Sequence, residues 1–342
     1  MSLDAVAPSS RQRSEVSASD RGLVGIVTPV YNGERYLAEC IESVLAQTYQ
    51  NWRYVIVDNC STDGSLALAR SYAGRDPRIT VVAATEHLPV QGSLSRTIGM
   101  VDPQAIYCKQ LMADDWLYPE CIEKMLEAAL QDPTVGLVCI YATNGTGVMF
   151  DSLAASGSAV TFLSGRDVCR IALLGRSEYF FGSPTTMLIR ADLIRKRQPF
   201  YNHATFNVDE ESCYDILQES NFCFLHQVLA LCRLHPRSQT SLHRHLGMIL
   251  VGRVQCLVKY GPVYLSAPEL ENRRREWFRG YYGFLAASAL HGAPREFWRF
   301  HRDKLRLLGV PLTTFRLARA ILRRLVGRLR SAFAALRGEN EL

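Results

Sequence analysis

The sequence predicts an α/β fold with a mostly parallel central sheet, followed by a helical C-terminal region. Between residues 23 and 141, short apolar runs alternate with stretches whose apolar residues recur at helical spacing, as in proteins built from repeated strand–helix units. The strand-like runs are apolar throughout, which indicates strands covered by helices on both faces. From about residue 242 onward the pattern is helical and rich in arginine.

The individual elements follow from these patterns in chain order. Strands are expected at residues 23–27, 54–57, 79–83, 105–111, 135–141, 185–190 and 228–234. Helices are expected at residues 34–48, 65–72, 119–131 and 210–220. In the first of these helices, Leu37, Ile41 and Val44 share one face, and Pro29 is expected to end the strand that precedes it.

Composition places the chain among ordinary globular proteins. Hydrophobic residues make up 48% of its 342 residues, and no apolar run approaches the roughly 18 residues of a bilayer-spanning helix. The first twenty residues lack the apolar segment of a signal peptide and are expected to form a loose tail. Ten cysteines without a Cys-x-x-Cys pair favour reduced, buried thiols in a cytosolic protein over zinc or disulfides.

Polar residues follow three of the predicted strands directly. These segments are Thr28–Gly33, Asp58–Gly64 and the pair Asp114-Asp115. Because ligands of such sheets bind outside the carboxyl ends of the strands, the three segments are candidates for one binding site. Each segment also has an ordinary interpretation, since the first two can be simple strand-end turns and the paired aspartates can cap the next helix.

The residues of these segments resemble glycosyltransferase family 2. The matching stretches are 27–32 (VTPVYN), 41–49 (IESVLAQTY), 57–65 (VDNCSTDGS) and 112–116 (MADDW), and the similarity continues more thinly to about residue 241. The resemblance implies the A-type, Rossmann-like fold of nucleotide-diphospho-sugar transferases. It also implies nucleotide contacts from Thr28, Pro29, Tyr31, Asn32, Asp58 and Asp114, and a Mn²⁺ or Mg²⁺ ion held by Asp115 with help from Asp114.

The same resemblance implies a catalytic base in the second half of the chain. Members of the family have an acidic residue before an Arg-x-His element, here Arg233-Leu234-His235, and counting back places Asp209 at that position. Glu210 is the neighbouring alternative, and a solvated helix N-terminus remains the ordinary interpretation of these acids. Arg96, His235 and Ser183 are candidates for phosphate or acceptor contacts, although the segment around Ser183 can equally be a plain turn.

Together these features predict an inverting glycosyltransferase. It would move a sugar from a nucleotide-diphosphate donor to the hydroxyl of a saccharide or lipid-linked acceptor, in cell-surface polysaccharide or glycolipid synthesis. The alternative is a non-catalytic sugar-nucleotide-binding or scaffold protein of the same fold. The absence of Gly-x-Gly-x-x-Gly after the first strand argues against a nicotinamide-dependent oxidoreductase.

The sequence predicts that the chain has three parts. A tail (residues 1–21) precedes the catalytic domain (22–241), which has a nucleotide-binding half (22–141) and an acceptor half (142–241). The helical region (242–342) follows, and its residues 312–338 carry seven of the arginines and no acid in a chain of net charge +6.

The C-terminal segment has the pattern of a basic amphipathic helix. Its apolar residues share one face, and most of its arginines lie beside or opposite that face. Such a helix suits an anionic membrane surface, and equally it can pack on the catalytic domain with its arginines in solvent. The expected location is therefore cytoplasmic, with peripheral attachment to the inner face of the membrane as an option. No nucleic-acid-binding motif is present, so no nucleic-acid partner is expected.

Overall fold

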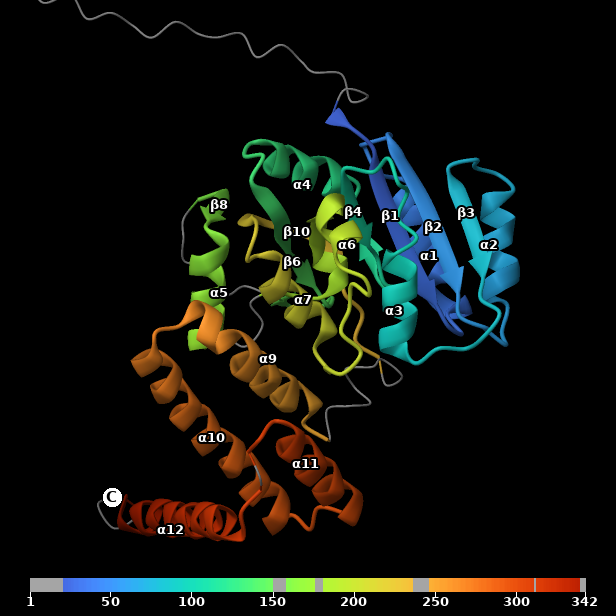
Figure 1. The fold of residues 1–342 in the computed structure, drawn as a ribbon. Helices are drawn as coiled ribbons and strands as arrows, with labels where there is room; N and C mark the ends of the chain where they lie inside the picture. The colour runs from blue at the N-terminus through green and yellow to red at the C-terminus, as the bar shows by residue number, and fades with distance from the viewer. Residues whose placement is uncertain (1–20, 150–157, 176–180, 236–245, 311, 339–342) are drawn as a thin grey trace, which may run out of the picture.

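A single mixed sheet organises the chain, as the computed structural model shows for residues 21–149, 158–175, 181–235, 246–310 and 312–338 (Figure 1). Its strand order is β3-β2-β1-β4-β9-β6-β10-β5, with β7 paired to β6 and β8 paired to β10. The strands are β1 (Val24–Val30), β2 (Trp52–Asp58), β3 (Ile79–Ala83), β4 (Tyr107–Gln110), β5 (Trp116–Leu117), β6 (Val135–Thr143), β7 (Val148–Met149), β8 (Val160–Leu163), β9 (Met187–Arg190) and β10 (Asn221–Leu231).

The sheet is mostly parallel, as predicted. Strands β3, β2, β1 and β4 form one parallel block, and β6 and β10 form a second one. Antiparallel pairings join these blocks and add the short strands, and none of them extends over more than four residues of a strand. Because Val30 pairs with Asp58 and Val27 pairs with Gln110, the loops after β1, β2 and β4 leave the sheet at one edge.

Helices cover both faces of this sheet and bury a separate core on each. The first face carries α1 (Glu34–Leu45), α2 (Ser65–Ala73) and α4 (Cys121–Leu130). The second face carries α3 (Val90–Ile98), α5 (Gly165–Leu174), α6 (Ala191–Lys196), α7 (Val208–Ile216) and α9 (Met248–Tyr264). Large aromatic side chains such as Trp52 in the first core and Phe222 in the second are fully buried, which stabilises the layered arrangement.

A third core holds the helical C-terminal region together, at the bottom of Figure 1. It lies between α9, α10 (Ala267–Leu290), α11 (Arg295–Leu307) and α12 (Thr314–Gly338). At its centre, His301 is fully buried and its Nδ1 lies 2.5 Å from the hydroxyl of Tyr281. Since α9 also contributes to the second core of the sheet, the helical region is packed onto the sheet; the predicted boundary at residues 241–242 lies outside the described residues.

Several predicted boundaries are wrong. Pro29 does not end the first strand, because β1 continues through Pro29, which pairs with Val57. Residues 221–227 belong to strand β10, which ends at Leu231, whereas the predicted strand covers 228–234. Its register with β6 shifts at three points, and these irregularities disturb the regular alternation of side chains on which the prediction relied. The sequence also did not predict α3, α5, α6 or the short strands β5, β7 and β8.

Buried ionisable side chains accompany these cores. All ten cysteines are unpaired thiols, and every one except the half-buried Cys60 is buried, which agrees with the prediction of reduced, buried thiols. Lys109 on β4 is also fully buried, with its Nζ 3.4 Å from the sulfur of Met125. Burial lowers the pKa of Lys109, because the charged ammonium loses its contact with water.

Candidate active site

The loops after β1 and β2 are hydrogen-bonded into one unit. Asn32 adopts a left-handed backbone conformation (φ +50°), which asparagine tolerates better than most residues. Its backbone N–H donates to Ser61 Oγ at 3.0 Å, and its side-chain Oδ1 accepts from the N–H of Thr62 at 2.8 Å. The N–H of Gly33 donates to Ser65 Oγ at 2.8 Å. Asn32 therefore acts within the protein by fixing the position of one loop against the other.

Asp58 lies in this unit at the end of β2 and is almost completely buried. Its Oδ2 accepts a hydrogen bond from the N–H of Ser61 at 3.0 Å. Its Oδ1 is buried and has no hydrogen-bond partner within the described part of the chain. An unsatisfied buried carboxylate oxygen is costly, so this atom is well suited to accept a hydrogen bond from a bound ligand.

Two aromatic rings stand beside the same loops. The Tyr31 ring is about half exposed, and its centroid lies 4.4 Å from that of His87. The side chain of Asn59 braces the segment that carries His87, because its Nδ2 donates to the Leu88 carbonyl at 2.8 Å and its Oδ1 accepts from the Leu88 N–H at 3.0 Å. A planar base can stack against a ring held in this way.

Asp115 is the more buried of the paired aspartates. Its Oδ2 accepts from the Thr185 hydroxyl at 2.5 Å, and its Oδ1 accepts from the Arg233 N–H at 3.0 Å. Burial and, secondly, the negative charge of Asp114 raise the pKa of Asp115 to about 7. Both carboxylate oxygens of Asp115 are thus already engaged by the protein.

Asp114 is more accessible, with 31% of its side chain exposed, and it contacts His235. Its Oδ2 lies 3.0 Å from Nε2 of His235. The ring of His235 in turn lies 5.4 Å from that of Tyr36 on α1, and the guanidinium of Arg233 lies 4.7 Å from the same tyrosine ring. Asp114 and His235 therefore offer an oxygen and a nitrogen ligand side by side at the surface.

A short strand brings these distant residues together. Leu117 and Trp116 of β5 pair with Ala230 and Leu231 at the end of β10. This pairing places the segment that follows β10, including Arg233 and His235, next to the paired aspartates that precede β5. The two-residue strand has no periodicity that a sequence pattern could detect, so the contact between Asp114 and His235 was not predictable from spacing.

The available side chains fit a divalent cation that is bound partly by the protein and partly by the oxygens of a diphosphate. In the described ranges, no group of three or more His, Cys, Asp or Glu side chains forms a protein-only metal cage. Mg²⁺ and similar ions at phosphate sites take one or two protein ligands and complete their shell with phosphate oxygens and water. Asp114 satisfies that requirement better than Asp115, because both oxygens of Asp115 are hydrogen-bonded, whereas among the described residues Asp114 is bonded through Oδ2 alone, to His235.

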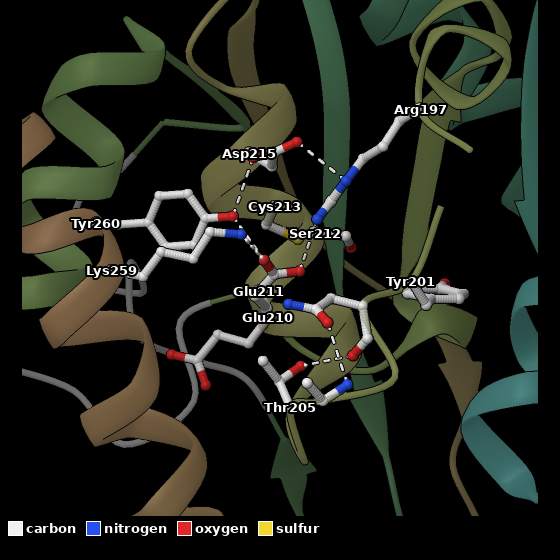
Figure 2. A network of polar contacts seen from close by, with 12 residues as sticks. Arg197, Tyr201, Thr205, Glu210, Glu211, Ser212, Cys213, Asp215, Lys259 and Tyr260 are labelled. Atoms are coloured by element: carbon white, nitrogen blue, oxygen red, sulfur yellow. Dashed lines mark hydrogen bonds and ion pairs between the residues drawn. The ribbon is translucent and has the colours of Figure 1, made fainter. Parts of the chain in front are cut away.

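The acids of α7 have different environments, and Figure 2 shows the one around Glu211. Glu211 is fully buried and accepts hydrogen bonds from Arg197 at 2.8 Å, Lys259 at 2.7 Å and the Tyr260 hydroxyl at 2.6 Å. Burial raises the pKa of Glu211, but the hydrogen bonds from Lys259 and Tyr260 and the charge of Arg197 outweigh it, so the pKa is lowered overall. Asp215 binds the same Arg197 at 3.0 Å. Glu211 is therefore charged at neutral pH and acts as a structural anchor between α7 and α9.

Asp209 differs from its neighbours because none of the described side chains forms an ion pair with it. It is half-buried, and its Oδ1 accepts a hydrogen bond from the Glu210 N–H at 2.9 Å. Burial raises the pKa of Asp209 to about 6, and the nearby charge of Glu210 adds to the effect. Glu210 itself accepts from the Asn207 side chain at 3.0 Å. Among the three acids, Asp209 has the properties of a proton acceptor near neutral pH.

One electrostatic interaction and one contact relate α7 to the sheet edge. The Tyr201 hydroxyl donates to Gln110 at the end of β4 at 2.5 Å, and burial and, secondly, the charge of Asp209 on α7 raise the pKa of Tyr201. On α7 itself, the sulfur of Cys213 lies 3.7 Å from that of Met187, two residues after the Thr185 that holds Asp115. The acids of α7 thus belong to the same side of the molecule as the aspartates after β4.

The remaining predicted residues are engaged within the protein. The hydroxyl of Thr28 is fully buried and accepts from Tyr54 at 2.8 Å, so this side chain is not available to a nucleotide. Pro29 is buried within β1. The Arg96 guanidinium pairs with Glu86 at 3.1 Å, and Ser183 Oγ lies 3.5 Å from the sulfur of Cys232. These contacts give no support to phosphate binding by Arg96 in this conformation.

Curated proteins with similar sequences include a chondroitin synthase and a putative teichuronic acid biosynthesis glycosyltransferase, both from bacteria. The chain is 33% identical over 136 residues to chondroitin synthase of Pasteurella multocida, which covers 40% of this chain and 14% of that protein. It is 32% identical over 127 residues to the putative teichuronic acid biosynthesis glycosyltransferase TuaG of Bacillus subtilis, which covers 37% of this chain and 48% of TuaG. The alignments thus span half or less of these relatives.

Solved structures with a similar fold extend over most of the chain. The structure of S. aureus TarS 1–349 in complex with UDP-GlcNAc has a TM-score of 0.61 and 14% identity, covering 84% of this chain and 80% of that one. The mannosyltransferase PcManGT of Pyrobaculum calidifontis, in complex with GDP-Man and Mn²⁺, has a TM-score of 0.50 and 16% identity and covers 88% of this chain and 86% of that one. At these identities the likeness concerns the fold. The model of glycosyl transferase family 2 matches residues 25–197, just over half of the sequence, and the chain belongs to that family.

Proposed function

We propose that the protein is an inverting glycosyltransferase that moves a sugar from a nucleotide diphosphate to an acceptor hydroxyl, in the synthesis of a cell-surface polysaccharide or glycolipid. The observation that carries the proposal is that three of its acidic side chains have different environments, each suited to a different role. Among the described residues, Asp58 has a buried oxygen without a partner, Asp114 contacts His235, and Asp209 has no cationic partner and has a raised pKa. Family membership and the polysaccharide transferases among the relatives support the same conclusion.

The donor nucleotide would bind at the loops after β1 and β2. The free Oδ1 of Asp58 can accept a hydrogen bond from a base N–H or a ribose hydroxyl, which would satisfy this buried atom. The half-exposed ring of Tyr31 can stack on the base, with His87 behind it. Asn32 supports both by joining the two loops.

The diphosphate would lie beside Asp114 and His235, which would hold Mn²⁺ or Mg²⁺ together with phosphate oxygens. When bound, the ion neutralises the charge that develops on the departing nucleotide diphosphate. Asp115 would support this arrangement, since its side chain joins the pair to the Thr185 hydroxyl and to the Arg233 N–H.

Asp209 would act as the general base. As the acceptor oxygen forms its bond to the anomeric carbon, the carboxylate takes the hydroxyl proton, and the bond from the anomeric carbon to the phosphate oxygen breaks. A single displacement of this kind inverts the anomeric configuration and needs no covalent enzyme intermediate. A pKa near 6 leaves Asp209 deprotonated at neutral pH, yet makes it more basic than an ordinary carboxylate.

The acceptor would be a saccharide or a lipid-linked saccharide. We propose that the transfer takes place in the cytoplasm at the inner face of an anionic membrane, where a lipid-linked acceptor would be found. The basic C-terminal segment, with seven arginines and no acid in residues 312–338, supports this location.

The test is a screen of UDP-, GDP-, CDP- and dTDP-sugars for hydrolysis and transfer in the presence of Mn²⁺ or Mg²⁺. We expect turnover of one donor class, dependence on the added ion, and release of that nucleotide diphosphate. Calorimetric titration of the corresponding nucleotide into wild type and Asp58→Asn provides the matched measurement of binding. Tight nucleotide binding without turnover of any donor would contradict the proposal and favour the non-catalytic alternative.

A further inference from the structure

Helix α12 lies at the end of the molecule remote from the sheet, across α10 (Figure 1). Leu317 and Ala320, on one side of the helix, are partly buried against the third core. This packing fixes the orientation of α12, so the rest of its surface points away from the protein. The sequence leaves two uses of this segment open, packing against the rest of the protein and binding a membrane surface. These uses involve different sides of the helix, so both are compatible with the packing of Leu317 and Ala320.

A second side of α12 is apolar and exposed. The exposed fractions are 74% for Phe315, 62% for Leu322, 40% for Leu325, 38% for Val326 and 59% for Leu329. Their spacing of three or four residues, or seven, places them in one stripe along the helix. A contiguous apolar stripe that is exposed to solvent is typical of an interaction site.

A third side carries positive charge. Arg316, Arg319 and Arg323 are exposed and follow one another at helical spacing beside the apolar stripe. No acidic residue occurs anywhere between residues 312 and 338, so nothing in this helix offsets their charge. None of the helices in the described ranges is long and apolar enough to cross a membrane.

We propose that the exposed side of α12 is a docking surface for an anionic lipid bilayer, with the helix lying in the plane of the headgroups. The apolar stripe would enter the boundary between headgroups and acyl chains, while the flanking arginines bind lipid phosphates. The proposal rests on the membrane-side location given under the proposed function, and it names the surface responsible. A second copy of the chain fits this side less well, because joining two such helices would bring their arginines together.

The test is flotation of the full-length protein on vesicles, one set made of equal parts phosphatidylglycerol and phosphatidylcholine and the other of phosphatidylcholine alone. We expect recovery with the anionic vesicles only, and a loss of binding as salt is raised. Hydrolysis of the nucleotide-sugar in solution is measured on the same samples, so that a failure to bind lipid is distinguished from a failure of the active site.

Two variants separate the apolar and the charged contributions. The apolar variant carries Phe315→Ser, Leu322→Ser and Leu329→Ser, all at exposed positions, and we expect it to bind the anionic vesicles at least about tenfold more weakly. In the charge variant, each of Arg316→Gln, Arg319→Gln and Arg323→Gln is expected to weaken binding about fivefold.

Matched control substitutions lie on neighbouring helices. Leu307→Ser removes a side chain of α11 that is 78% exposed, and Arg274→Gln removes an exposed charge of α10. Both controls should bind like wild type. Equal binding of wild type to neutral vesicles, or wild-type binding by the apolar variant, would overturn the proposal. Absence of flotation would also overturn it, and self-association lost in the apolar variant would then identify a second copy as the occupant.

Discussion

The molecule carries two groups of carboxylates, and the protein treats them in opposite ways. At the sheet edge, Asp58 and Asp115 are buried and held by backbone N–H groups and a hydroxyl, with no basic side chain paired to either in the described residues. At the start of α7, Glu211 is surrounded by Arg197, Lys259 and Tyr260. The sheet edge therefore holds Asp58 and Asp115 without ion pairs to any described residue, whereas α7 neutralises Glu211 with two cations of the protein.

The difference shows how the same side-chain chemistry acquires different roles. A carboxylate without an ion-pair partner in the protein can be neutralised by a cation from outside. Among the α7 acids, the ion pairs fix Glu211 and Asp215 in place and leave Asp209 without a cationic partner in the described residues. We therefore expect mutations at the sheet edge to change nucleotide and metal binding, and mutations around α7 to change turnover or stability.

The largest expected effect is on turnover, in Asp209→Asn. Without the base, kcat should fall by between about 10²-fold and 10⁴-fold, while nucleotide affinity stays at the wild-type level. The control is Glu210→Gln, which removes the neighbouring acid and should keep most of the activity. Steady-state kinetics with the donor found in the screen, and calorimetry with the nucleotide, measure the two quantities. Full activity of Asp209→Asn would place the base elsewhere.

The next effect is on stability, in Glu211→Gln. The substitution leaves Arg197 and Lys259 beside a neutral amide at a buried position, which should lower the free energy of unfolding by about 3–5 kcal/mol. Lys196→Gln is the matched control, because its ion pair with Glu219 is exposed and should contribute less than about 1 kcal/mol. Urea denaturation followed by circular dichroism compares them. Equal losses in the two variants would show that the buried network is not an anchor.

Within the sheet edge, two variants should lose different kinds of binding. Asp58→Asn should weaken nucleotide binding about tenfold or more, both with Mn²⁺ and with a chelator present, because its contact is to the nucleotide itself. Asp114→Asn should lose a similar factor only when Mn²⁺ is present. Titrating the nucleotide under both conditions tests the assignment. A metal-independent defect in Asp114→Asn would remove it from the metal site.

The smallest effect is the pH dependence of the reaction. A base must be deprotonated to act, and the raised pKa of Asp209 keeps the protonated, inactive form populated up to about pH 6. The value of kcat/KM should therefore rise about tenfold per pH unit below pH 6 and level off above it. Glu210→Gln removes a charge that raises this pKa, so its profile should shift to lower pH. A profile that is flat through pH 6 would contradict the role of Asp209.

The sequence predicts the first half of the fold well because its strands are continuous apolar runs. The predicted strand at residues 79–83 matches β3, and Asp114 follows β4 as expected, whereas Asp58 is itself the last residue of β2. The second half is less predictable, since β10 contains register shifts and β5 has only two residues. Both features depend on tertiary pairing, which leaves little local signal.

The sequence predicts which acidic residues belong to the site. It does not predict which role each of them has. Asp209, Glu210 and Glu211 are consecutive acids, and only the folded chain shows that Arg197 and Lys259 pair with the third of them. In the same way, adjacent aspartates 114 and 115 are equivalent in the sequence, yet Thr185 and Arg233 engage the second and His235 meets the first. Contacts between residues 14 to 121 positions apart decide these differences.

Lys109 has a practical consequence for following the folding of this protein. It is one of five lysines in the sequence, and its amine is sealed between the sheet and α4 beside Met125. An amine-directed acylating reagent needs an accessible, unprotonated nitrogen, so it can reach Lys109 only when β4 and α4 separate. The rate at which this one lysine is acylated would thus report how often β4 and α4 separate.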